Sequence, residues 1–182
     1  MRRDIDAYAP ILEMICRKYI PGWLLVARWY LETGTPSALA MAKEAARRFL
    51  EEEAQTNAAA DGWRLLAQAC YRSGDALGEV HALIERSQIQ SIPFPDLSNT
   101  ASMLNRLLST HAVEVGRDDR RRLAAVLERR RSEADAVDYS RMAWLALHLS
   151  DEAKAAEYVR AGLECDPDDL HCLRLAMKLE VS

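Results

Sequence analysis

Residues 139–167 read YSRMAWLALHLSDEAKAAEYVRAGLECDP, and this stretch decides the fold class. Its first half places apolar and small side chains three and four residues apart, as one buried face of a helix requires. Ser150 and Asp151 interrupt that pattern, and a second helical period follows until Asp166 and Pro167 close it. The spacing therefore predicts two helices joined by a tight turn, a helix hairpin over 136–169.

The same order of features recurs along the chain. The residues that anchor the first helix of each unit fall 40, 38, 38 and 34 residues apart, and they are Trp23, Trp63, Ala101, Tyr139 and Leu173. A period of this length is typical of a helical solenoid. We therefore predict an all-α, right-handed α-α superhelix of stacked antiparallel hairpins, a single domain over 1–182. It would comprise an N-terminal helix over 1–20, about four hairpins over 21–56, 57–90, 96–135 and 136–169, and a capping helix over 170–182.

One segment, 91–96, interrupts the helical pattern. It reads SIPFPD, and its two prolines each remove a backbone donor and disfavour helix in the residue before them. We expect 91–96 to be an extended linker and the internal connection that a protease cuts first.

Composition and charge narrow the function classes. The chain is 49% hydrophobic, has seven glycines and six prolines, and carries a net charge of -4. An acidic chain argues against a dedicated nucleic-acid binder and against anionic membranes. No apolar run approaches the ~20 residues of a spanning helix, and no stretch of signal-peptide kind follows Met1. Four scattered cysteines fit a reducing compartment, so we expect a cytoplasmic protein.

The hairpins resemble tetratricopeptide repeats, well over 20–53, 60–88 and 136–182 and weakly over 89–135. The first helix and turn of that repeat are matched by Trp63, Leu66, Ala67, Cys70, Gly74 and Asp75. The whole repeat is matched by Tyr139, Met142, Ala143, Asp151, Ala155 and Pro167. The resemblance implies that the concave face of the array is the surface that binds partners.

The resemblance also implies which side chains line the concave face. Carried over by position, the candidates are Arg28, Arg64, Gln68, Tyr71, Arg72, Arg141, Trp144, His148 and Arg174. The residues alone point the same way, because the four candidates from 64 to 72, and the three from 141 to 148, each share one helix face. The guanidinium group of arginine can bind a carboxylate through two hydrogen bonds, and exposed aromatic rings supply contact area for a partner. The pattern predicts a module that binds an acidic or extended protein segment.

The carboxylate-clamp version of this repeat is not expected. That clamp places lysine and asparagine at set positions of the first helices. Here Leu24 and Arg28 stand at one such pair of positions, and Arg64 and Gln68 stand at the next. A heat-shock-chaperone adaptor is therefore not predicted.

Two other functions stay open, and the oligomeric state is not fixed by the sequence. One is a stand-alone chaperone or regulator of a secreted or effector protein. The other is an RNA-binding helical repeat, suggested by seven arginines between Arg117 and Arg131. Acidic residues are interspersed among those arginines, and no aromatic residue lies among them to stack on bases. A charged outer helix face explains them better.

The chain carries no complete catalytic or metal-binding motif. Cys165, His171 and Cys172 lie close together, but zinc sites use shorter spacers and a second pair of ligands. The four histidines accompany no phosphate-binding loop and no nucleophile motif. We therefore expect no enzyme, no cofactor and no metal.

Overall fold

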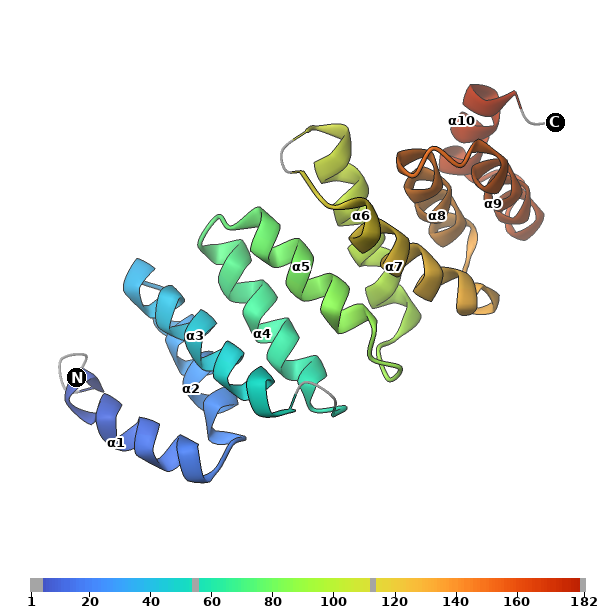
Figure 1. The fold of residues 1–182 in the computed structure, drawn as a ribbon. Helices are drawn as coiled ribbons and strands as arrows, with labels where there is room; N and C mark the ends of the chain where they lie inside the picture. The colour runs from blue at the N-terminus through green and yellow to red at the C-terminus, as the bar shows by residue number, and fades with distance from the viewer. Residues whose placement is uncertain (1–4, 54–55, 112–113, 181–182) are drawn as a thin grey trace. The chain divides into compact units, whose positions relative to one another are not determined.

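A computed structural model describes residues 5–53, 56–111 and 114–180 (Figure 1). Within these ranges the chain forms ten α-helices and no strand, which confirms the all-α prediction. None of these helices is both long enough and apolar enough to cross a membrane. The chain divides into two compact units, an N-terminal unit over 1–89 and a C-terminal unit over 90–182.

The N-terminal unit contains five helices. They are α1 (Ile5–Lys18), α2 (Gly22–Thr33), α3 (Pro36–Glu53), α4 (Ala59–Arg72) and α5 (Ala76–Ser87). The helices from α2 to α5 each pack extensively on the next one along the chain, and α2 also contacts α4. Because α1 contacts α2 over only a few residues, the core of this unit lies between α2 and α5.

Small residues let these helices approach closely. Ala27, Ala42, Ala46 and Ala69 have no exposed surface, and they pack with Phe49, which is 1% exposed. Close packing of this kind brings the helix backbones together where larger side chains would separate them.

Two turns in this unit have clear local causes. Gly34 ends α2 with a φ of 70°, a left-handed conformation that favours glycine, and its N–H donates to the Tyr30 carbonyl at 3.1 Å. Asp75 begins α5 by accepting the Gly78 N–H at 2.9 Å, and it also accepts a hydrogen bond from Lys43 Nζ at 2.9 Å. The Lys43 bond, helped by that of Gly78, lowers the pKa of Asp75.

The C-terminal unit contains the other five α-helices. They are α6 (Phe94–Ser109), α7 (Arg117–Arg129), α8 (Ala136–His148), α9 (Glu152–Cys165) and α10 (Leu170–Leu179), with a short 3-10 turn over Arg131–Glu133. Helices α8 and α9 form the most closely packed pair, α6 packs on α8, and α10 packs on both α8 and α9 (Figure 1). By contrast, α7 contacts α6 and α8 over few residues, so the stretch expected to form a hairpin over 96–135 is loosely packed.

Aspartates begin three successive helices of this unit. Asp135 and Asp138 form a reciprocal capping box at the start of α8, with N···O distances of 2.9 and 3.2 Å. Asp151 accepts the Lys154 N–H at the start of α9, and Asp169 accepts the Cys172 N–H at the start of α10. These caps fix the residue at which each helix starts. They thereby set which side chains of α8 and α10 face each other.

The prediction of an extended linker over 91–96 is wrong for residues 94–96, which are helical. Helix α6 begins at Phe94, so Pro95 lies in its first turn, where a residue without an N–H loses no intrahelical hydrogen bond. Ile92 and Phe94 are 3% and 2% exposed, and the Arg130 guanidinium donates to the Ile92 carbonyl at 2.5 Å. The segment is anchored by this burial and this hydrogen bond.

Candidate functional site

The candidates of the N-terminal unit lie on α2 and α4. Arg28 on α2 and Gln68 on α4 are exposed, and Tyr71 is 68% exposed. Arg64 is half-buried and is held by Asp61 of the same helix, with Nη2 and Oδ1 2.9 Å apart. This ion pair is partly exposed, so it contributes little to stability and leaves the Arg64 guanidinium accessible.

Arg72 has a structural contact that the sequence pattern does not reveal. Its guanidinium donates a hydrogen bond to the main-chain oxygen of Leu31, in the last turn of α2, and it lies against Gly34. Arg72 thus joins α4 to the end of α2, and the residue remains exposed.

In the C-terminal unit a groove runs between α6, α8 and α10. It has a cavity volume of about 200 Å³, and its lining residues are Ser102, Asn105, Val137, Ser140, Arg141, Trp144 and His171. The groove brings together two of the predicted site residues, Arg141 and Trp144. We define these seven residues as the α8 groove.

Arg141 is fixed in the groove from one side. Its Nη1 donates to Ser98 Oγ at 2.9 Å and lies 3.5 Å from Asp138 Oδ1, while the Ser98 hydroxyl itself donates to Asp138. Its Nε and Nη2 make no hydrogen bond to any residue in the described ranges. The guanidinium is therefore held in place by one nitrogen and keeps two nitrogens able to bind a carboxylate.

Asn105 was missed by the sequence analysis. Its side chain is buried on α6, and its Nδ2 donates to the main-chain oxygen of Arg141 at 2.8 Å. Its Oδ1 is also buried and has no hydrogen-bond partner among the described residues. A buried acceptor without a donor costs about 1–3 kcal/mol. The signal that could have found it is an asparagine between Leu104 and Leu108, on a helix that reads as apolar.

Trp144 lies under a positive charge. Lys178 Nζ on α10 is 4.4 Å from the centre of the Trp144 ring, a cation–π contact, and the His148 ring is 6.3 Å from the same ring. His148 Nε2 is 3.3 Å from Ser109 Oγ. Burial, and then the charge of Arg120, lower the pKa of His148. The positive charges of Arg120 and Lys178 thus lie near Trp144 and His148.

Two predicted site residues do not line the α8 groove. His148 lies one turn beyond Trp144 on α8, and Arg174 is exposed on α10. The structure therefore brings Arg141 and Trp144 together and leaves Arg174 as an exposed charge of the same unit.

The arginine-rich stretch over 117–131 is largely occupied by contacts within the chain. Arg120 Nη1 donates to the His148 carbonyl at 2.6 Å, Arg130 pairs with Glu133 at 2.7 Å, and Arg131 with Glu157 at 2.6 Å. These three arginines therefore contact carboxylates and a helix end of the same unit.

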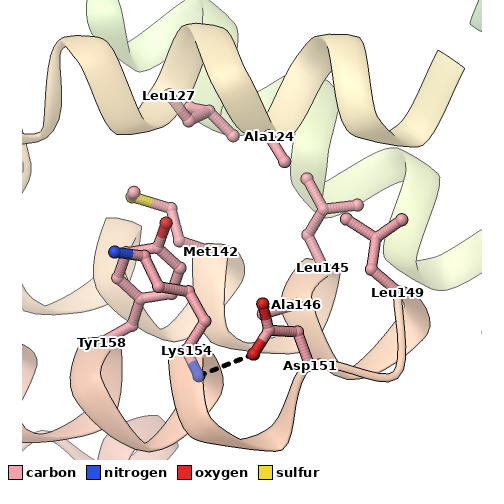
Figure 2. A pocket seen from close by; sticks show the side chains of 9 residues that line it. All are labelled: Ala124, Leu127, Met142, Leu145, Ala146, Leu149, Asp151, Lys154 and Tyr158. Carbon is pink, nitrogen blue, oxygen red and sulfur yellow. Dashed lines mark hydrogen bonds between the residues drawn. The ribbon is translucent and has the colours of Figure 1, made fainter. Parts of the chain in front are cut away.

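A second, smaller cavity lies beneath α7 (Figure 2). It measures about 80 Å³ and is lined by Ala124, Leu127, Met142, Leu145, Ala146, Leu149, Asp151, Lys154 and Tyr158. At its edge the Tyr158 hydroxyl donates to Glu128 at 2.6 Å, and Lys154 Nζ donates to Glu128 at 2.9 Å. The cavity is about half the ~150 Å³ that accommodates benzene.

The cysteine and histidine stretch near α10 does not assemble a metal site. Within the described residues no three His, Cys, Asp or Glu side chains lie close enough to hold one ion. Cys165 is exposed, whereas Cys172 is buried and its Sγ lies 3.3 Å from the Ala136 carbonyl. Cys172 therefore packs α10 against α8.

Comparison with known proteins adds no family. No known family model matches this chain, and a search of curated proteins finds no relative.

Proposed function

We propose that this chain is a protein-interaction module, a right-handed stack of hairpins of the tetratricopeptide kind that works in the cytoplasm, and that it binds an acidic, extended segment of a partner in the α8 groove. The observation that carries the proposal is the side chain of Arg141. It is held through Nη1 by Ser98 and Asp138, and its two further nitrogens bind no residue that the structure describes. A guanidinium fixed in this way is already oriented for a carboxylate, so binding costs little side-chain entropy.

The surroundings of Arg141 support an anionic ligand. Trp144 offers a planar surface beside it, Lys178 stacks on that ring, and His171 completes the groove from α10. Among the described residues, the one carboxylate that contacts Arg141 is that of Asp138, which is 8% exposed and already accepts the Ser98 hydroxyl. Local charge therefore favours an acidic segment although the chain as a whole is acidic.

A stand-alone chaperone is the second candidate, and a separate observation favours it. Leu170, Leu173 and Met177 lie on one face of α10, and they are 65%, 38% and 75% exposed. An exposed apolar stripe at this spacing suits the apolar face of a client helix. An RNA-binding repeat is less well supported, because the arginines over 117–131 are engaged within the chain.

The first test is binding of a defined acidic peptide. Fluorescein-labelled acetyl-hexaglutamate amide would be titrated with the full chain by fluorescence anisotropy, with labelled hexalysine as the opposite-charge probe. We expect hexaglutamate to bind and Arg141→Gln to weaken it about 10-fold, because one charged hydrogen-bonding contact is lost.

The matched control is Arg160→Gln. Arg160 is an exposed arginine of the same unit, on α9 and outside the groove. The Arg160→Gln substitution removes the same charge as Arg141→Gln, so we expect it to change the affinity for hexaglutamate by less than about 2-fold. Equal weakening by both variants would mean that net charge alone attracts the peptide, and would refute the groove as the site.

A further inference from the structure

The α8 groove contains an acceptor that the chain itself leaves unpaired. Asn105 is 8% exposed, and its amide is held in one orientation because Nδ2 donates to the Arg141 carbonyl at 2.8 Å. The amide cannot turn over without losing that bond, since a carbonyl accepts only from a donor. Its Oδ1 therefore stays the free atom, buried and facing no described donor.

The neighbouring groove residues do not supply the missing donor. The Ser140 hydroxyl donates to the Val137 carbonyl at 2.7 Å, and the engaged nitrogen of Arg141 is directed to Ser98 and Asp138. No hydrogen bond joins Ser102 to Asn105 in the described part of the chain. A ligand that completes the groove must therefore bring an N–H or O–H of its own.

We propose that Asn105 Oδ1 accepts a main-chain N–H of the bound segment while Arg141 binds a carboxylate of the same segment. This inference rests on the proposed function and names its ligand class: a peptide in extended conformation that offers both an amide donor and a carboxylate. Other polyanions fit worse. A fully ionised phosphate chain offers acceptors alone, and it would place an acceptor against Asn105 Oδ1.

The carboxylate can come from two sources, an acidic side chain or a free C-terminus. Two probes separate them: acetyl-hexaglutamate amide has side-chain carboxylates alone, and acetyl-hexaglycine with a free C-terminus has one terminal carboxylate. Binding of either probe that Arg141→Gln weakens supports a carboxylate at Arg141 and identifies its source. Absence of binding by both probes would refute the proposed function, and this inference with it.

The decisive comparison removes the N–H groups and keeps the charge. If the carboxylate comes from a side chain, acetyl-hexaglutamate amide and its fully N-methylated form would be titrated with the wild-type chain. If it comes from a free C-terminus, acetyl-hexaglycine acid and its N-methylated form would be compared in the same way. We expect the N-methylated probe to bind about 5- to 10-fold more weakly, as expected for one lost hydrogen bond in a buried site. Wild-type binding that is equal for both forms would overturn the inference while leaving the Arg141 result, and so the proposed function, intact.

Asn105→Ala tests whether the lost N–H acts at this residue. N-methylation also alters the shape of a peptide, so the variant supplies the control. We expect Asn105→Ala to bind the parent probe 5- to 10-fold more weakly and to bind both forms within about 2-fold. If the variant still binds the parent and N-methylated probes with different affinities, the peptide N–H donates to another acceptor and the assignment to Asn105 is wrong. Should the variant fail to fold, the wild-type comparison still decides.

Discussion

The guanidinium of Arg72 donates a hydrogen bond to the main-chain oxygen of Leu31, 41 residues earlier in the chain. Carbonyls in the last turn of a helix lack an intrahelical donor, and a cation there also complements the helix dipole. The C-terminal unit uses the same device, because Arg120 donates to the His148 carbonyl at the end of α8, at 2.6 Å. Arg72 and Arg120, which look like surface charges in the sequence, thus cap the C-terminal ends of α2 and α8 respectively.

The first prediction concerns the stability that Arg72 contributes. We expect Arg72→Ala to lower the free energy of unfolding by about 1–2 kcal/mol, because the Leu31 carbonyl loses a charged donor. The control is Tyr71→Ala, since Tyr71 is 68% exposed and its removal should cost less than about 0.5 kcal/mol. Urea unfolding followed by circular dichroism measures both. Equal losses would show that Arg72 does not act as a cap.

The second prediction concerns the crossing of α3 and α4. Glycine in a helix interior is usually less stable than alanine by roughly 0.5–1 kcal/mol. At Gly62, however, an added Cβ would lie 2.7 Å from Phe49 Cδ1 and 2.9 Å from Leu50 Cδ2. We expect Gly62→Ala to destabilise the protein by about 1–3 kcal/mol, since the buried side chains of Phe49 and Leu50 would have to shift.

Gly116→Ala is the control for that substitution. The nearest atom to a Cβ at Gly116 is Asp119 Oδ2 at 3.7 Å, and its φ is -55°, which any residue adopts. Thermal unfolding of this variant should stay within about 0.5 kcal/mol of the wild type. A Gly62→Ala protein as stable as the wild type would contradict the close crossing.

The third prediction concerns Glu128, which ties α7 to α9. It accepts the Tyr158 hydroxyl at 2.6 Å and Lys154 Nζ at 2.9 Å. Burial alone would raise the pKa of Glu128, but these two hydrogen bonds and the charges of Lys154 and Arg131 together hold the pKa below its usual value. A carboxyl group with a lowered folded pKa stabilises the fold above the unfolded pKa, and that stabilisation is lost as the pH falls through the folded value.

A double-mutant cycle of Tyr158→Phe and Glu128→Gln measures this contact. We expect Tyr158→Phe alone to cost about 1 kcal/mol at neutral pH and the coupling energy to be of similar size. The coupling should shrink as the pH falls through the lowered pKa of Glu128, where the carboxylate takes up a proton. Coupling that is absent at neutral pH would show that α7 is held by its apolar contacts.

The parts of the fold that the sequence predicts are those fixed by local rules. Trp63 and Tyr139 anchor helices where spacing alone indicates them, and Asp75 and Asp151 lie at the turns that the pattern indicates, where they cap α5 and α9. The start of α6 was misjudged because Pro95 occupies the first turn, where proline is as acceptable as in a linker. Local pattern does not distinguish these two uses.

The candidate site was predicted less completely, because its remaining features depend on tertiary contacts. Arg141 and Trp144 follow from helical spacing, and they do line one groove. Asn105 became part of that groove only when α6 packed on α8, and Arg72 became a cap only when α4 met the end of α2. Side-chain partners more than 30 residues apart are not encoded in the periodicity of either helix.

The last prediction concerns the pH dependence that His148 brings. Burial first, then the charges of Arg120 and Lys178, lower its pKa, whereas a hydrogen bond involving the Asn105 backbone opposes them; His111 also lowers it. The unfolded chain therefore takes up a proton near pH 6.5, before the folded chain does. Stability is unaffected above that pH and falls as the pH drops from about 6.5 to the lower folded value.

Thermal unfolding at about pH 7.5 and pH 5.5 should show this loss in the wild type. His148→Gln keeps a polar side chain that cannot be protonated, so we expect its melting temperature to fall less over the same range. If both proteins lose the same amount, the acid sensitivity arises from other groups and His148 is not desolvated in solution.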